Sequence, residues 1–194
     1  MARISTLEPP YEPPVDGCLA AMMPPGEPPI RLFRTFANNL AMTRAMQASG
    51  AYELGRSLSL SMREREIVID RTCARCLCEY EWGVHTARFA ERVGLTPAQV
   101  VSLVHGSPFD ACWDDERERL LILAVDSLHA TATVGDPLWS RLQNTFTDAE
   151  LLDLLMLCGW YHAISFTANA AAVEPEPGAP RFDDLHGSGA GFRP

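Results

Sequence analysis

The chain has 194 residues, 47% of them hydrophobic, which is enough to build one well-buried core. Its net charge of −9 argues against nucleic-acid binding, which needs a basic surface. All sixteen basic residues are arginine, and the lack of lysine excludes Schiff-base chemistry and a Walker-type phosphate loop.

Residues 1–29 hold eight prolines in four adjacent pairs, at 9–10, 13–14, 24–25 and 28–29. Paired prolines predict an extended arm rather than a helix. Apolar residues between the pairs, among them Leu19 and Met22, indicate an arm that packs on its own body or on a neighbouring subunit. The composition fits a disordered tail equally well.

A helical pattern begins at residue 30. Apolar residues recur at three- and four-residue steps from Ile30 to Met46, and Ser49-Gly50 interrupts them. The next helix is expected over 62–76, capped by Ser59 or Ser61. The following one is expected over 78–93, with Gly94 as its terminator.

The rest of the chain predicts four more helices and no strand, because no segment alternates apolar and polar residues with period two. The last of them is apolar on nearly every side, which is typical of a helix in the centre of a core or at a subunit contact. The predicted fold is therefore all-α, with about seven or eight helices in one domain over 30–173, an extended tail over 174–194, and assembly as a homo-oligomer. The four helices are expected at 96–105, 114–129, 136–142 and 148–170.

The sequence shows no run of about 18 apolar residues and no basic segment followed by an apolar stretch. We therefore expect no membrane span and no secretory signal, with the cytoplasm as the compartment. Six cysteines are then expected to be reduced thiols rather than a disulfide framework.

The chemistry-bearing residues concentrate between positions 66 and 85. On a continuous helix Cys78, Glu81 and His85 stand at i, i+3 and i+7 and share one face. A position at the helix start is expected to lower the pKa of the Cys78 thiol. Glu66, on the preceding helix, meets them only if the two helices form an antiparallel hairpin. A thiol, two carboxylates and an imidazole are the groups that proton transfer or thiol chemistry requires, so we predict a catalytic site here.

Two further residues are candidates for binding a substrate. Tyr80 is either a hydrogen-bond donor in the pocket or a packed aromatic residue, and His162 is either a site residue or a satisfied core histidine. Cys73, Cys76 and Cys78 with His85 are a conceivable zinc set, but their spacing is only partly right and the helical core needs no metal. No metal is therefore predicted.

The stretch Arg65-Glu66…Cys78-Glu-Tyr-Glu81-Trp-Gly-Val-His85 resembles the core motif of the carboxymuconolactone decarboxylase family, whose fold is shared with AhpD-like proteins. Downstream, Trp160-Tyr161-His162 also resembles family members. The resemblance covers roughly residues 30–182. It implies an all-helical fold that assembles as trimers or hexamers, with pockets at or near the subunit contacts.

The AhpD-like peroxidases carry the pattern Glu-x11-Cys-x-x-Cys-x3-His, in which two thiols cycle through a disulfide. The resemblance places the glutamate at Glu66, the first cysteine at Cys78 and the histidine at His85. Glu81 stands where the second cysteine is expected, and a carboxylate forms no disulfide. Cys73 or Cys76 is then the substitute for the resolving thiol.

The decarboxylase branch of the family implies proton transfer to a small carboxylated or lactone substrate, without metal or organic cofactor. Glu66, Glu81 and His85 would share the acid–base role, and Arg75 or Arg71 would bind the substrate carboxylate. Three functions stay open: such an enzyme, a thiol peroxidase centred on Cys78, and a non-catalytic oligomeric binding protein.

Overall fold

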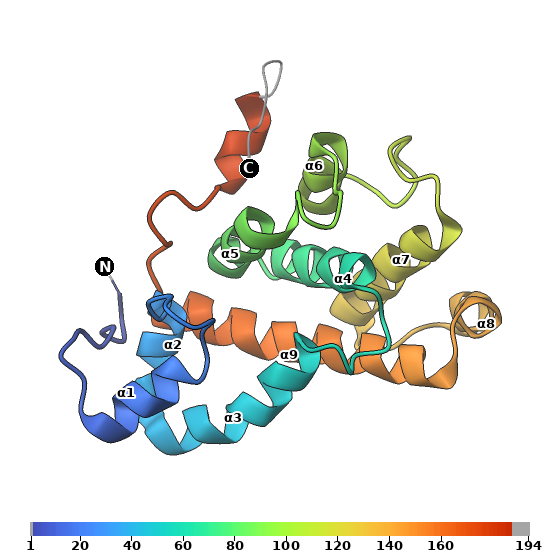
Figure 1. Ribbon diagram of the computed structural model, residues 1–194. Coiled ribbons are helices and arrows are strands. Elements are labelled where there is room, and N and C mark those ends of the chain that lie inside the picture. Colours follow the sequence, from blue (N-terminus) through green and yellow to red (C-terminus); the bar gives the residue numbers. More distant parts are fainter. Residues whose placement is uncertain (1, 188–194) are drawn as a thin grey trace.

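The computed structural model describes residues 2–187, which form helices and no strand (Figure 1). This confirms the all-α fold. In chain order the helices are α1 (Pro13–Ala20), α2 (Arg31–Phe36), η1 (Ala37–Asn39), α3 (Leu40–Glu53), α4 (Met62–Arg75), α5 (Glu79–Phe89), α6 (Pro97–His105), α7 (Glu116–Thr131), α8 (Asp136–Thr145), α9 (Asp148–Ala171) and η2 (Phe182–Gly187), where η marks a 3₁₀ helix.

Helices α4 and α9 form the centre of the molecule. In Figure 1, α9 runs across the middle, with α4 to α7 on one side of it and α1 to α3 on the other. Three consecutive residues of α4, Ile67, Val68 and Ile69, are fully buried. Consecutive helical residues point about 100° apart, so neighbours must cover α4 around more than half of its circumference. Each such side chain contributes about 1.5–3 kcal/mol of burial free energy.

Helix α4 also carries charges into this centre. Arg65, Glu66, Asp70 and Arg71 are all buried. A buried charge is costly unless it is paired and hydrogen-bonded. The helix thus places ionisable groups where only partners on neighbouring helices offset their loss of hydration.

The start of α4 follows the sequence closely. Ser61 accepts a hydrogen bond from the amide of Glu64, and Glu64 accepts one from the amide of Ser61, which is a complete capping box. The same box begins α6 at Thr96 and α9 at Thr147, as expected. These helix starts depend only on residues three positions apart, so the local sequence is sufficient to locate them.

A tight turn joins α4 to α5. The amide of Cys78 donates to the carbonyl of Cys73 (2.8 Å) and the amide of Leu77 to that of Ala74 (3.0 Å). These are the two bonds of a Schellman motif, and Leu77 occupies its left-handed position with φ 52°. The turn reverses the chain, so Glu66 early in α4 faces His85 late in α5.

Three predicted boundaries are wrong. The arm over 1–29 is not extended throughout, because Pro13-Pro14 occupy the first turn of α1, where a missing N–H removes no helical bond. Ser49-Gly50 does not end α3, which continues to Glu53. There the side chain of Trp160 lies 3.7 Å from the position a Cβ of Gly50 would occupy, and packing outweighs the low helix propensity. Helix α5 ends at Phe89, and turns continue to Gly94.

The N-terminal arm packs on its own chain. Cys18 and Leu19 of α1 are buried, and the amide of Arg3 donates to the carbonyl of Ala171 at the end of α9. The C-terminal tail also returns to the body, where the carboxylate of Glu176 accepts a hydrogen bond from Tyr80 (2.6 Å). The tail is not wholly extended, since η2 covers 182–187; residues 188–194 lie outside the described part.

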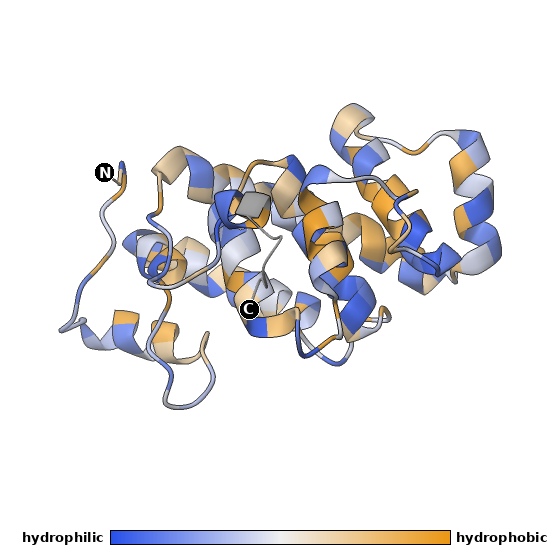
Figure 2. Cartoon of the chain, turned by 90° about the horizontal axis from the view of Figure 1, so that it is seen from above, coloured by the Kyte–Doolittle hydropathy of each residue, from blue (hydrophilic) through white to orange (hydrophobic). Residues whose placement is uncertain are grey.

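Helix α9 is apolar enough to require an explanation. By length and composition alone this 24-residue helix would suffice to cross a membrane. Its most apolar 18-residue stretch has a mean hydropathy of 1.3, and half of that stretch is buried inside the protein. Packing against α4, α5, α7 and α8 accounts for the buried side, so α9 has the character of a core helix. In Figure 2, apolar and polar residues alternate along the individual helices, as expected when each helix has one side in a core.

Candidate active site

A cavity of about 390 Å³ lies between an N-terminal wall, made by residues 21–24, α2 and α3, and the pair α5 and α9. Most of its wall is apolar, with Met22, Phe33, Phe36 and Trp160 among the larger side chains. Apolar walls with a few convergent polar groups are typical of sites for small organic molecules. The polar groups come from Gln47, Glu81, His85, Arg88 and Tyr161.

The His85 imidazole is the centre of this polar set. It is buried, and its Nδ1 donates to the Glu66 carboxylate at 2.8 Å. Glu66 is in turn paired with Arg65, whose guanidinium nitrogens lie 2.6 and 2.7 Å from the other carboxylate oxygen. This chain of contacts sets the orientation of the ring, so that Nε2 faces the cavity.

Two proton-carrying groups of the cavity wall lie beside Nε2. The Tyr161 hydroxyl of α9 is 3.0 Å away, and a carboxylate oxygen of Glu81 is 3.6 Å away. A neutral imidazole accepts a hydrogen bond from the hydroxyl, whereas an imidazolium donates one. The rings of His85 and Tyr161 meet edge to face, at 5.1 Å between centroids.

Burial and charge act against each other at His85. Burial disfavours the imidazolium, but the negative charge and hydrogen bond of Glu66, helped by Glu81 and Asp70, outweigh it and raise the His85 pKa. Burial raises the pKa of Glu81, and the His85 charge opposes this. Burial also raises the Tyr161 pKa, so this group is a neutral phenol at physiological pH.

These groups together hold protons at positions suited to acid–base chemistry. Both the His85 and the Glu81 pKa are raised, so each group keeps its proton to a higher pH than it would in water, as a proton donor requires. Perturbed groups that meet in a cavity mark a functional-site candidate. The arrangement can deliver a proton to, or remove one from, a molecule bound in the cavity.

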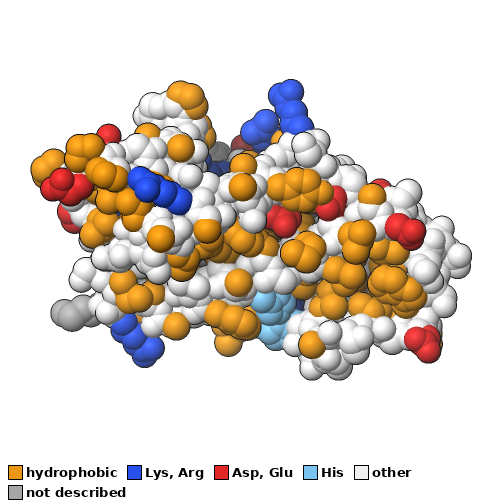
Figure 3. Space-filling view, turned by 90° about the horizontal axis from the view of Figure 1, so that it is seen from below, with side chains coloured by type: hydrophobic (Ala, Val, Ile, Leu, Met, Phe, Trp, Pro, Cys, Tyr) orange, Lys and Arg blue, Asp and Glu red, His pale blue; other side chains and the backbone are white. Residues whose placement is uncertain are grey.

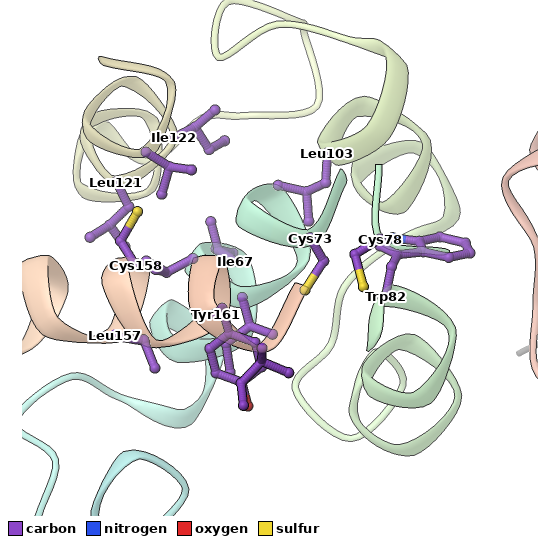
Figure 4. Close-up of a cluster of buried hydrophobic side chains, with 14 of the residues drawn as sticks. Ile67, Cys73, Cys78, Trp82, Leu103, Leu121, Ile122, Leu157, Cys158 and Tyr161 are labelled. Atoms are coloured by element: carbon purple, nitrogen blue, oxygen red, sulfur yellow. The ribbon is translucent and has the colours of Figure 1, made fainter. Parts of the chain in front are cut away.

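Cys78 differs from its expected state. It is fully buried, does not line the cavity, and burial raises the pKa of its thiol to about 11, although a helix start was expected to lower it. The reason is that loss of hydration outweighs the contact with the backbone at Glu81. Figure 4 shows Cys78 next to Cys73 in the buried apolar cluster.

Three predicted substrate-binding residues lie away from the cavity. Tyr80 is buried, and its hydroxyl accepts from the amide of Leu32 and donates to Glu176, so it ties the tail and α2 to α5. Arg75 is ion-paired with Asp126 on α7. His162 contacts His129 instead of the cavity, because it projects from α9 in a different direction from Tyr161.

The alternatives considered for an arginine and for zinc also fail on geometry. Arg71 is buried and bonds Asp126 together with three carbonyls at the end of α6, so it is a structural group. The zinc set of three cysteines and His85 is not assembled, since Glu66 and Tyr161 take both ring nitrogens of His85.

Two residues of the cavity were missed. Arg88 is three positions after His85 and seven after Glu81, so helical spacing alone would have placed it on the same face. It lines the cavity and pairs at its partly exposed end with Glu27. Tyr161 had no such signal, because it meets His85 only through the packing of α9 on α5.

Comparison with known proteins gives a consistent picture. A family model described as "Carboxymuconolactone decarboxylase family" matches residues 41–126. Over this stretch, which is less than half of the 194-residue chain, the sequence is similar to the carboxymuconolactone decarboxylase family. The matched stretch contains Glu66, Cys78, Glu81, His85 and Arg88, and it ends before Tyr161. No curated protein matches the sequence.

Two solved structures share the fold of this chain. A peroxidase-related protein from Silicibacter sp. TM1040 is 18% identical, with a TM-score of 0.75 over 96% of this chain and 94% of that one. A protein from Ralstonia eutropha JMP134, described as an alkylhydroperoxidase AhpD core, is 17% identical, with a TM-score of 0.77 over 90% and 92%. At these identities the likeness establishes the AhpD-like fold alone.

The family match covers only part of the cavity wall. Helices α1 and α2 and the segment between them, which carry Met22 and Phe33, precede the matched residues, and α9 follows them. The shared stretch supplies the acid–base groups, and the flanking segments supply much of the apolar wall. The flanking segments therefore set the shape of the space in which a substrate is bound.

Proposed function

We propose that this protein is an enzyme of the carboxymuconolactone decarboxylase-like group that performs acid–base chemistry, without a cofactor, on a small carboxylated or lactone substrate. The observation that carries the proposal is the position of His85 Nε2, which opens into an apolar cavity between Glu81 and Tyr161. Glu66 holds the opposite side of the ring.

The protonated groups of the cavity wall are suited to a decarboxylation. When a carboxylate leaves as CO₂, the bonding electron pair stays on the carbon and spreads into the lactone carbonyl. The His85 imidazolium then gives its Nε2 proton to that carbon, and the neutral ring recovers a proton from solvent through Glu81 or Tyr161. The net change consumes one proton and releases one CO₂.

Arg88 is the group of the cavity wall suited to holding an anionic substrate. A guanidinium binds a carboxylate through two parallel N–H donors. Its present partner, Glu27, lies in a pair that is partly exposed on both sides, and such pairs contribute at most about 1 kcal/mol. A substrate carboxylate in the cavity would replace Glu27 at little cost.

The test is CO₂ release from a panel of carboxylated lactones by the wild-type protein and by His85→Gln and Glu81→Gln. Loss of a catalytic acid lowers kcat about 10²–10⁴-fold. His105→Gln and Glu91→Gln, which make the same substitutions outside the cavity wall, are the matched controls and are expected to keep full turnover. Full turnover in His85→Gln would refute the proposed role of the imidazole.

A thiol peroxidase is the second candidate, supported by the neighbouring positions of Cys73 and Cys78 and by the peroxidase-related descriptions of the two similar folds. In such a cycle a hydroperoxide is reduced to an alcohol and water while the two thiols become a disulfide. The burial of both thiols and the raised pKa of each favour the acid–base function instead.

The activities of two variants, Cys78→Ser and His85→Gln, distinguish the two functions. A peroxidase loses peroxide consumption in Cys78→Ser and retains part of it in His85→Gln, whereas the acid–base enzyme shows the reverse order for CO₂ release. Cys112→Ser, at a half-buried cysteine outside the cavity, serves as the thiol control.

A further inference from the structure

Three side chains with metal-binding atoms meet at a point outside the cavity. Cys76 lies at the end of α4, His129 in the last turn of α7 and His162 in the middle of α9. One donor atom from each residue lies within 4.8 Å of the other two. None of the three lines the cavity, so the His85 site does not explain the cluster.

Two of the three distances between donor atoms are close to those of a tetrahedral zinc site, and the third pair, from Cys76 and His162, lies within 4.8 Å. His129 Nδ1 is 3.0 Å from His162 Nε2, and Cys76 Sγ is 4.0 Å from His129 Nδ1. Bonds of about 2.0–2.1 Å to nitrogen and about 2.3 Å to sulfur at tetrahedral angles put these pairs about 3.3 and 3.6 Å apart. Shifts of a few tenths of an ångström would satisfy both.

The backbone sets the His162 ring in the orientation that a metal requires. Its Nδ1–H donates to the carbonyl of Cys158 at 2.8 Å, which leaves the lone pair of Nε2 directed toward His129. A metal-binding histidine almost always has its other ring nitrogen held in this way. On the cysteine side, Asn169 donates to the carbonyl of Cys76 at 2.9 Å and ties that turn to α9.

The cluster is also accessible from solvent. Cys76 and His162 are partly buried. His129 is exposed, which gives an ion a path from solvent.

We propose that Cys76, His129 and His162 bind a divalent transition-metal ion, with zinc the best match to one thiolate and two imidazoles. Three protein ligands leave the fourth tetrahedral position open for water or another small ligand. The alternative is a plain N–H···N hydrogen bond between the two histidines, for which 3.0 Å is also suitable. Metal binding and the hydrogen bond predict different spectra.

Cobalt(II) is the probe, because a tetrahedral thiolate site gives visible d–d bands and a near-ultraviolet thiolate-to-cobalt band. The full chain, reduced and stripped with a chelator, is expected to bind one equivalent of cobalt, which zinc then displaces. Cys76→Ser should lose the thiolate band, and His129→Gln should lose the tetrahedral spectrum. Cys112→Ser and His105→Gln are the matched controls and should keep both.

Thermal unfolding provides a second readout that does not depend on the cobalt spectrum. Zinc is expected to raise the Tm of the wild-type protein and of Cys112→Ser but not that of His129→Gln, because only a folded site binds the ion. His129 is exposed, so this variant should fold as the wild type does. A wild-type protein with no tetrahedral cobalt spectrum, or one whose thiolate band survives Cys76→Ser, would overturn the proposal.

Discussion

His85 presents its two ring nitrogens to different surroundings. Nδ1 is held by the paired carboxylate of Glu66, and Nε2 faces the cavity. The charge of Glu66 is the main influence that favours the imidazolium against burial. The residue that tunes the proposed acid is therefore itself outside the cavity wall.

Glu66→Gln is expected to lower the His85 pKa, because the amide carries no charge. The proposed acid is the imidazolium, so activity falls as the pH rises through the His85 pKa, and this limb should move to lower pH in the variant. An NMR titration of the imidazole together with a pH profile of kcat checks both shifts. Glu91→Gln, at an exposed site, should change neither; an unmoved profile in Glu66→Gln would contradict the tuning role.

Asp70 is a buried carboxyl group whose Oδ1 has no hydrogen-bond partner. Burial, followed by the charge of Glu66, raises its pKa well above 3.8. A raised carboxyl pKa means that the folded state binds a proton that the unfolded state has released. Folding stability is therefore lost as the pH rises from the unfolded value toward the folded one.

Asp70→Asn removes this pH dependence. Relative to the wild type, the free energy of unfolding of the variant should increase, so that the variant becomes the more stable by comparison, as the pH rises above about 4, the ordinary pKa of an aspartate. Urea unfolding at a series of pH values measures the difference. A constant offset between the two proteins at every pH would show that Asp70 is ionised normally in the folded state.

At the scale of the element, the chain ends three of its helical segments with the same pair of hydrogen bonds. The left-handed position is occupied by Leu77 after α4, by Gly94 after α5 and by Ala172 after α9. Only glycine adopts that conformation without strain. For a residue with a Cβ the left-handed conformation costs about 1–2 kcal/mol. Two of the three turns therefore depend on tertiary packing to hold a residue that disfavours them.

Reciprocal substitutions at Ala172 and Gly94 test whether a residue with a Cβ is strained at the left-handed position. Ala172→Gly is expected to stabilise the fold by about 0.5–1 kcal/mol, since relief of strain exceeds the added freedom of the unfolded chain. Gly94→Ala should destabilise it by about 1 kcal/mol, because a Cβ there meets nothing closer than 3.9 Å and the strain acts alone. Urea unfolding measures both; equal signs would contradict the argument.

At the scale of the whole molecule, α9 has an exposed apolar side opposite its buried one. Leu152, Met156 and Phe166 are each more than 60% exposed. Figure 3 shows hydrophobic side chains, with histidine between two groups of them, on the lower face of the molecule. An apolar patch of this kind is typical of a protein–protein contact.

Assembly as a homo-oligomer remains a prediction, and we expect this side of α9 to take part in it. Met156→Glu would bury a charge in the contact and should shift the protein to the 21.4 kDa monomer. Sedimentation velocity measures the mass. Gln143→Glu, an exposed position on α8, adds the same charge and should leave the assembly intact, whereas a monomeric wild type would remove the basis of the prediction.

Local sequence predicted the features that depend on neighbours along the chain. The capping boxes located the starts of α6 and α9, and two candidate capping serines bracketed the start of α4. The spacing of Glu66, Glu81 and His85 indicated one site. Leu77 closes the turn that brings α5 back along α4, so the glutamate meets the imidazole as the hairpin hypothesis required.

Tertiary packing decided what surrounds each group. Cys78 has a pKa of about 11 rather than a lowered one because other helices remove its water. Arg75 and Arg88 are both helical arginines with the same capacity to bind a carboxylate. Only Arg88 is on the side of its helix that faces the cavity. Tyr161 reaches His85 across 76 positions, and Cys76 reaches His129 across 53. Hydration and long-range contact depend on which helices meet, and local periodicity carries no information about that.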